Sequence, residues 1–273
     1  MASTVAAPTP AIGGHTHAKW TPVAAFGMLL MAAGMALWIV GGLIAGQSVG
    51  GDFAFLFIGV GAPLVGAALT WRAGTVGKIL GVLLAAATLF VMFWVAFSLG
   101  APNAFVEFSG AVMFVMGGLT AVGYGVGSIV HRKDLFATAT RGETRARVIM
   151  VGIAIVAMLV SGVLNFTGRT SVDAAAAGGA TPIAMANFEF SPATLSATAG
   201  EPTTIVMHNS DAFTHDFVIE ALGVNSGLMS PGSQQLIEIT AAEPGEYLFR
   251  CTLHSGAADT PEEAGMAGML VVE

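Results

Sequence analysis

The chain has little cysteine and little charge. One cysteine, Cys251, occurs in 273 residues, which rules out a disulfide bond within the chain. Only 10% of the residues are charged and 55% are hydrophobic, whereas about 25% of the residues in soluble domains are charged. Residues 181–273 contain twelve acidic residues and one basic residue, Arg250. Because phosphate binding needs the opposite sign of charge, we expect no nucleic-acid partner.

Long apolar runs fill the first two thirds of the chain. A membrane span needs about 20 mostly apolar residues, and none of the candidate runs contains a histidine or a charged residue in its middle. The absence of histidine gives no support to a bis-His haem inside them. We therefore predict a cytoplasmic tail over residues 1–21 and an all-α bundle in the lipid bilayer over residues 22–167. The five predicted transmembrane helices are Val23–Gly46, Phe53–Trp71, Ile79–Leu99, Phe108–Val130 and Val148–Phe166.

The basic residues between these spans predict an orientation. Lys19 precedes the first span, and Arg72 and Lys78 lie between the second and third. A further basic group lies between the fourth and fifth spans, while the two remaining loops carry no Lys or Arg. Short cytoplasmic loops are enriched in Lys and Arg, so we predict a cytoplasmic N-terminus. Five spans then place the C-terminal part at the extracytoplasmic face. The basic group comprises His131, Arg132, Lys133, Arg141, Arg145 and Arg147.

Two kinds of residue in the predicted bundle could carry chemistry. Glu107 lies at the outer end of the fourth span. Intramembrane carboxylates are functional by default, but Glu107 can reach the interface, and we interpret it as structural. We interpret the methionines of the spans as adaptable core or lipid-facing residues and not as a copper path. They are Met28, Met31, Met35, Met92, Met113 and Met116.

After residue 181 the apolar runs give way to alternation. Residues 168–181 are small and polar and are typical of a linker. Over residues 182–273, short alternating stretches are separated by turn residues, which predicts an antiparallel β-sandwich. The predicted strands are Ile183–Phe190, Thr194–Thr198, Thr203–His208, Asp216–Ala221, Gln235–Thr240, Glu246–Cys251 and Met269–Val272.

Four residues near the ends of these strands have the chemistry of metal ligands. Cys251 ends a predicted strand, His254 follows it on a loop, and Met266 precedes the last strand. His215 follows a turn earlier in the chain. Two imidazoles, a thiolate and a weak axial thioether are the ligand set of a blue-copper electron-transfer site. We therefore predict one type 1 copper ion, with Met269 as the alternative axial ligand.

Residues 181–273 also resemble a cupredoxin of the plastocyanin-like kind. This resemblance implies a Greek-key sandwich in which His215, Cys251 and His254 are the equatorial copper ligands and Met266 is the axial ligand. The matching stretches are Asn187–Leu195 with Gly200, Asn209–His215, Tyr247–His254 and Ala264–Gly268.

The chain departs from the family pattern in two places. Eleven residues separate His254 from Met266, where the family usually has only a few, so the extra segment must bulge outward or fold over the site. Asp216 follows the first histidine ligand, where the family often has asparagine. The single cysteine excludes a dinuclear copper site that needs two.

The predicted function is that of a membrane-anchored electron carrier and not of an enzyme. Its partner would be a redox protein such as a c-type cytochrome, a terminal oxidase or a copper reductase. Acidic residues near the metal, including Asp211 and Asp216, would attract a basic partner. Two alternatives stay open. The chain could be the electron-donor module, or a fragment, of a copper-dependent nitrite reductase system, or it could transport or sense copper.

Overall fold

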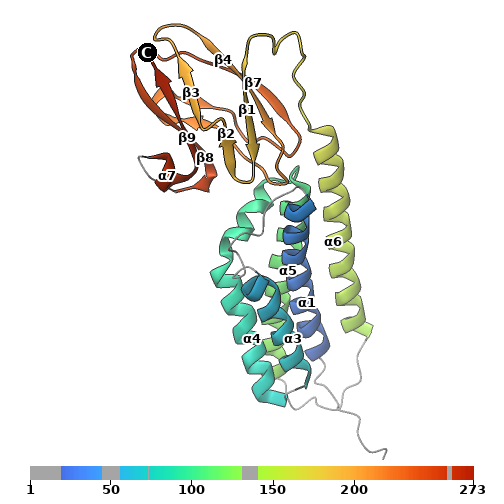
Figure 1. The fold of residues 1–273 in the computed structure, drawn as a ribbon. Coiled ribbons are helices and arrows are strands. Elements are labelled where there is room, and N and C mark those ends of the chain that lie inside the picture. The colour runs from blue at the N-terminus through green and yellow to red at the C-terminus, as the bar shows by residue number, and fades with distance from the viewer. Residues whose placement is uncertain (1–19, 45–55, 73, 131–140, 257–259) are drawn as a thin grey trace, which may run out of the picture.

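The structure is a computed structural model in which helices precede strands (Figure 1). The helices stand side by side as a bundle, and the β domain lies at one end of that bundle (Figure 1). The predicted tail, apart from its last residues, lies outside the described part of the chain. The residues described are 20–44, 56–72, 74–130, 141–256 and 260–273.

The bundle contains five α-helical segments, one π-helix and one 3-10 helix among the described residues. Four helices are long and apolar enough to cross a membrane: Thr21–Ile44, Gly74–Val91, Phe105–Val130 and Thr144–Thr167. The second predicted span corresponds to a shorter apolar helix, Phe57–Arg72. Four of the five predicted spans thus have a helix of sufficient length. In chain order the elements are α1 (Thr21–Ile44), η1 (Leu56–Gly61), α3 (Ala62–Arg72), α4 (Gly74–Val91), η2 (Phe93–Gly100), α5 (Phe105–Val130) and α6 (Arg141–Thr167).

The helices alternate in direction along the bundle. In Figure 1, α1, α4 and α6 lead toward the β domain, and α3 and α5 lead away from it. The starts of α1 and α6 and the junction between α3 and α4 therefore lie at the end of the bundle far from the strands (Figure 1).

Paired glycines set the spacing between α1 and α5. A Cβ atom on Gly27 would lie 2.6 Å from the carbonyl oxygen of Gly117, and one on Gly117 would lie 2.5 Å from that of Gly27. Gly34 and Gly110 repeat this arrangement one heptad away, because a Cβ atom on either would lie within 2.9 Å of the other's carbonyl oxygen. Small residues of this kind allow membrane helices to approach backbone to backbone. Any larger side chain at these positions would separate the two helices.

We expect Gly117→Val to lower the free energy of unfolding by about 1–3 kcal/mol, the usual cost of overpacking. The valine side chain would overlap the backbone of α1. Gly123→Val is the matched control, because a Cβ atom at Gly123 of the same helix meets nothing within 4 Å. Thermal unfolding of the full chain in detergent measures both. Equal destabilisation by the two variants would contradict the packing role of Gly117.

Two sheets form the β domain. One has the strand order β2-β1-β4-β7, and the other has the order β3-β9-β8-β5-β6. Apolar side chains from both sheets, including Ile205, Ile219, Phe249 and Leu270, form one buried cluster between them. The strands are β1 (Thr181–Ala186), β2 (Glu189–Ser191), β3 (Thr194–Ala197), β4 (Thr203–Asn209), β5 (Val218–Ile219), β6 (Val224–Asn225), β7 (Gln234–Ile239), β8 (Gly245–Ser255) and β9 (Gly265–Val272).

The sandwich is not wholly antiparallel, and that part of the prediction was wrong. β1 pairs with β4 in parallel, and β3 pairs with β9 in parallel. Parallel neighbours need a crossover connection. The chain provides one, because it visits the second sheet at β3 between β1 and β4. Alternation within each strand contains no information on which distant strand lies beside it.

The strand predicted over Ile183–Phe190 is interrupted by a turn. Asn187 and Phe188 have φ values of 54° and 60°, and the chain reverses there into β2. Asparagine tolerates this left-handed region, but a bulky residue such as phenylalanine rarely adopts it. Such backbone strain tends to cluster at functional sites.

The segment predicted as a linker contacts the edge of the first sheet. The side-chain hydroxyl of Thr170 donates to the backbone carbonyl of Gln234 at 2.7 Å, and the backbone N–H of Gln234 donates to the carbonyl of Thr170 at 2.8 Å. The backbone N–H of Val172 donates to the side chain of Gln234. These contacts hold the chain against β7 directly after α6.

Candidate metal centre

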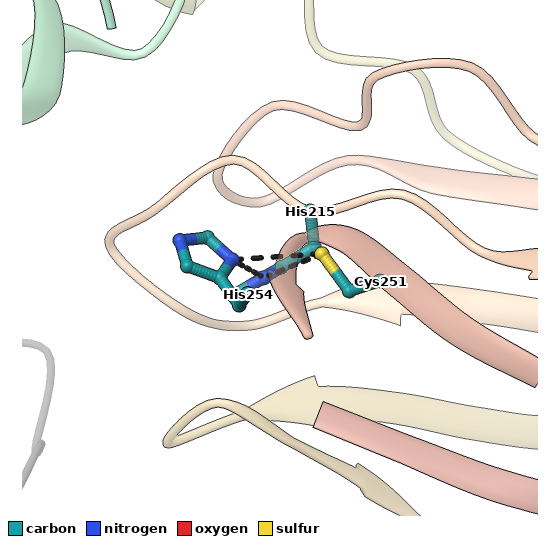
Figure 2. A group of neighbouring side chains, drawn as sticks. All are labelled: His215, Cys251 and His254. Atoms are coloured by element: carbon teal, nitrogen blue, oxygen red, sulfur yellow. Dashed lines mark hydrogen bonds between the residues drawn. The ribbon is translucent and has the colours of Figure 1, made fainter. Parts of the chain in front are cut away.

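Three of the four predicted ligands come together in the β domain. His215 lies in the segment between β4 and β5, residues 210–217, which we name the ligand loop. Cys251 and His254 both lie in β8, and Figure 2 shows the three side chains directed toward one another. Their ligand atoms all lie within 4.8 Å of one another. His215 and Cys251 are fully buried, and His254 is partly exposed.

The three ligand atoms form a triangle of the right size for a metal ion. Nδ1 of His215 lies 3.1 Å from Nδ1 of His254. Sγ of Cys251 lies 3.7 Å from the first nitrogen and 3.5 Å from the second. The point equidistant from all three lies about 2 Å from each, which is close to the bond lengths of first-row metals such as zinc to imidazole nitrogen and thiolate sulfur. The residues present therefore fit a soft or borderline metal ion.

An irregularity in β8 allows Cys251 and His254 to face the same point. Residues three apart in a regular strand point to opposite faces of the sheet. The pairing of β8 with β9 shifts register between Arg250 and Ser255, so the strand is not regular across the two ligands. Bulges of this kind re-aim side chains and are common beside functional sites. The prediction that His254 lies on a loop after the strand is corrected, because β8 continues to Ser255.

Asp211 fixes the orientation of the His215 ring. Its Oδ2 atom lies 3.0 Å from Nε2 of His215, and both side chains are buried. A carboxylate only accepts, so Nε2 carries the proton and Nδ1 keeps its lone pair for a metal. Oδ2 of Asp211 also accepts a hydrogen bond from the backbone N–H of Phe188 at 3.2 Å. Asp211 thus joins the strained β1–β2 turn to a ligand.

The turn places an aromatic ring beside both histidines. The ring centroid of Phe188 lies 4.8 Å from that of His254 and 5.7 Å from that of His215, edge to face in both cases. These separations are typical of favourable aromatic pairs. The strained conformation at Phe188 therefore serves to pack its ring against the candidate ligands.

Asp216 ties the ligand loop to β8. Its Oδ1 atom accepts a hydrogen bond from the backbone N–H of Thr252 at 2.6 Å, and its other oxygen accepts one from the Thr252 hydroxyl. Asp216 follows His215 and Thr252 follows Cys251, so one carboxylate joins the neighbours of two candidate ligands. Aspartate can thus join the two segments at a position where the family often has asparagine.

The protonation states of the candidate ligands follow from their burial. Burial raises the pKa of the Cys251 thiol to about 12. Burial, together with the nearby His215 ring, lowers the pKa of His254 to about 4. Burial would raise the pKa of Asp211, but its hydrogen bond to His215 and the charge interaction with that ring keep this pKa below its ordinary value. At neutral pH, His254 is neutral, as a metal ligand must be.

Met266 and Met269 occupy different environments. Met266 is 1% exposed and belongs to the same cluster of buried side chains as Cys251. Met269 is half-buried and pairs with Leu248 on one side and Thr194 on the other. The burial of Met266 in the same cluster as Cys251 favours it over Met269 as the axial ligand. The role of Met266 stays a prediction.

The structure describes part of the extra segment between His254 and Met266, residues 255–265. It contains a single helical turn, α7 (Pro261–Ala264), and the backbone N–H of Gly256 donates to the carbonyl of Ala264 at 2.8 Å. Residues 257–259 lie outside the described part of the chain.

Two of the acidic residues predicted to attract a partner are not on the surface. Asp211 and Asp216 are each 5% exposed, and both accept hydrogen bonds within the site. The prediction of their role in attracting a partner was wrong. The structural role of these two residues was missed because the sequence does not show whether an acidic side chain near a ligand faces solvent or the ligand. Their positions four residues before and one residue after His215 were the only available signal.

Comparison with known protein families identifies the C-terminal part of the chain. The sequence model described as the cupredoxin-like domain matches residues 153–260. The C-terminal domain is cupredoxin-like. The match begins within α6, includes the ligand loop and the ligand end of β8, and ends before α7. A search of curated protein sequences found no match.

Solved structures that match part of this chain include copper proteins. An auracyanin of Roseiflexus castenholzii is 19% identical, covers 35% of this chain and 97% of its own, and has a TM-score of 0.28. Auracyanin A of Chloroflexus aurantiacus, a blue copper protein, is 21% identical, covers 34% and 98%, and has a TM-score of 0.27. The metal-binding domain of a Cu(I)-exporting P-type ATPase of Streptococcus pneumoniae is 18% identical, covers 38% and 93%, and has a TM-score of 0.29. None of these likenesses extends over the whole chain.

We expect copper binding to the metal-free cupredoxin-like domain of the intact chain to release about one proton near pH 7. The Cys251 thiol, whose pKa is raised to about 12, is protonated there and must bind as the thiolate, whereas His254 has no proton to lose. The apparent affinity should therefore rise about tenfold per pH unit between pH 7 and 12. Calorimetric titration with copper in two buffers of different ionisation enthalpy measures the proton count. Binding with no net proton release would contradict the displacement of the Cys251 thiol proton by copper.

Proposed function

We propose that this protein is a membrane-anchored type 1 copper protein that transfers single electrons. The observation that carries the proposal is the meeting of Nδ1 of His215, Nδ1 of His254 and Sγ of Cys251 within 4.8 Å. This is the equatorial ligand set of blue-copper sites, to which Met266 would add the weak axial thioether. A copper ion bound there would supply one-electron chemistry by alternating between Cu(I) and Cu(II).

The surrounding residues hold the ligands in fixed positions. Asp211 orients the His215 ring, and Asp216 joins the ligand loop to β8. Asn209 donates hydrogen bonds to the carbonyls of Phe213 and Met229, both at 2.8 Å. Fast electron transfer requires ligands that barely move between oxidation states. These buried hydrogen bonds restrain the loop that carries His215.

His254 is the ligand through which we propose that electrons enter and leave. It is partly exposed, whereas His215 and Cys251 are fully buried. Its neighbour Leu253 is 48% exposed. A redox protein such as a c-type cytochrome, a terminal oxidase or a copper reductase is the proposed partner.

We propose that the bundle crosses the cell membrane five times and that the β domain lies at the extracytoplasmic face. α1 and α4 both lead toward the β domain, so the chain between them, including Phe57–Arg72, must return to the far end of the bundle (Figure 1). Arg72 ends α3, and Lys78 lies near the start of α4. The start of α6, which contains Arg145 and Arg147, lies at the same end (Figure 1). Basic residues at the end far from the strands support a cytoplasmic location for that end.

The test of this function is the colour of the copper-loaded protein. We expect the intact chain with Cu(II) to be intensely blue and to be bleached reversibly by a mild reductant. Cys251→Ser should remove the blue absorption and the electron transfer, because no thiolate would remain in the site. Visible absorption spectroscopy of protein purified from membranes measures the blue absorption and its bleaching by the reductant.

The control is membrane insertion, which Cys251→Ser should leave unchanged because Cys251 lies in the β domain. A blue Cys251→Ser variant would show that Cys251 is not the ligand. A colourless wild-type protein that holds only Cu(I) and exchanges it rapidly would support copper transport or sensing instead.

The axial position can be tested by a pair of variants. We expect Met266→Leu to retain copper and to raise the reduction potential, because the axial ligand tunes the potential of blue-copper sites. Met269→Leu, the matched control on the same strand, should leave the potential unchanged. Redox titration followed at the blue absorption band measures both. A shift with Met269→Leu alone would assign the axial position to Met269.

A further inference from the structure

Side chains of the helical bundle contact the ligand loop at Phe213 and Thr214, the two residues before His215. The backbone N–H of Thr214 donates to Oε2 of Glu107 in α5 at 2.7 Å. Glu107 is 5% exposed and Thr214 is 1% exposed, so this hydrogen bond is shielded from water. The two residues are 107 positions apart in the chain. A bundle residue thus provides the acceptor for a backbone group directly beside a candidate copper ligand.

A tryptophan of α1 supports the same contact. The indole Nε1–H of Trp38 donates to the backbone carbonyl of Glu107 at 3.0 Å. The ring of Trp38 packs against the ring of Phe213 with centroids 5.4 Å apart, and Phe213 packs against Phe188 at 5.2 Å. Phe188 in turn contacts the rings of both candidate histidine ligands. The aromatic contacts are therefore continuous from the bundle to the site.

A third contact involves the segment at Met229, which pairs with His215 as an isolated antiparallel bridge. The backbones of His215 and Met229 exchange two hydrogen bonds, at 3.2 and 2.7 Å. Ser230 follows Met229, and its side chain is hydrogen-bonded to that of Asn103. Asn103 lies two residues before the start of α5. The carbonyl of Asn103 accepts a hydrogen bond from the Asn165 side chain of α6 at 2.8 Å. Both backbone segments that fix His215 are thus attached to the bundle.

We propose that the end of the bundle beside the β domain is part of the copper centre and that Glu107 is a positioning residue for His215. This inference rests on the proposed copper function and deepens it. By holding the Thr214 N–H, Glu107 fixes the ligand loop and with it the position of Nδ1 of His215. The coordination geometry of the copper then depends on the membrane helices, which do more than anchor the domain. A buried carboxylate in a membrane helix is costly and is functional by default.

The test compares Glu107→Gln with Glu107→Leu in the intact copper-loaded chain. Glutamine keeps an oxygen acceptor for Thr214, whereas leucine leaves the buried N–H without a partner, which is costly. The ratio of the two strongest visible bands of a copper site depends on the geometry of its ligands. We expect Glu107→Leu to change this ratio and Glu107→Gln to keep the wild-type ratio. We also expect Glu107→Leu to release copper to a chelator about tenfold faster. Unchanged bands in folded Glu107→Leu would overturn the proposal.

The matched control is Thr70→Val, which removes a buried hydrogen-bonding hydroxyl from α3. Thr70 is 1% exposed and its hydroxyl contacts Sδ of Met28 at 3.7 Å. We expect this variant to leave the copper bands unchanged. If Thr70→Val alters the bands as much as Glu107→Leu does, the effect is a general loosening of the bundle, and the positioning role of Glu107 is wrong.

A second variant decides the matter if Glu107→Leu does not fold. Trp38→Leu removes the ring that packs against Phe213, and we expect it to shift the same band ratio. Wild-type bands in folded Trp38→Leu would then overturn the proposal. A wild-type protein without blue-copper bands would instead contradict the proposed function itself, so the two failures are distinguishable.

Discussion

The meeting of two imidazole nitrogens and one thiol sulfur is the constraint on which the rest of the β domain depends. His215 comes from a loop, and Cys251 and His254 come from an irregular strand. Nitrogen lone pairs 3.1 Å apart repel each other unless a proton or a cation lies between them. The fold keeps them together through Asp211, Asp216 and the strained turn at Phe188. A metal ion bound between the three atoms would turn this unfavourable contact into a favourable one.

The contact between the two parts of the chain gives the helices a second role. Glycine pairs bring α1 and α5 together, and the same two helices carry Trp38 and Glu107. The packing that assembles the bundle therefore also positions the residues that reach the ligand loop. An electron carrier tethered by a flexible linker would lack this relation, because its site would be independent of its anchor.

Much of the architecture could be predicted from local patterns. The apolar runs predicted five spans, and four of these correspond to helices of spanning length. Alternation predicted most strands of the sandwich. The types and order of His215, Cys251 and His254 predicted a metal site because few other functions use that set. Glu107 was interpreted as structural, since its sequence neighbours do not show that its partner is Thr214, 107 residues away. The turn at Phe188 was missed because residues 183–190 were interpreted as one alternating strand. The large apolar residues in fact change there from odd positions, Ile183 and Met185, to even positions, Phe188 and Phe190.

The sequence by itself determined which segments are apolar enough for a membrane, which segments alternate as strands, and which side chains can bind a soft metal. These properties depend on residue type and short spacing alone. Only the tertiary structure decided that β1 lies parallel to β4, that the pairing of β8 shifts register between Arg250 and Ser255, and that Asp211 faces a ligand and not solvent. Such features depend on which distant segments pack together, because the energy of a buried contact is set by both partners at once.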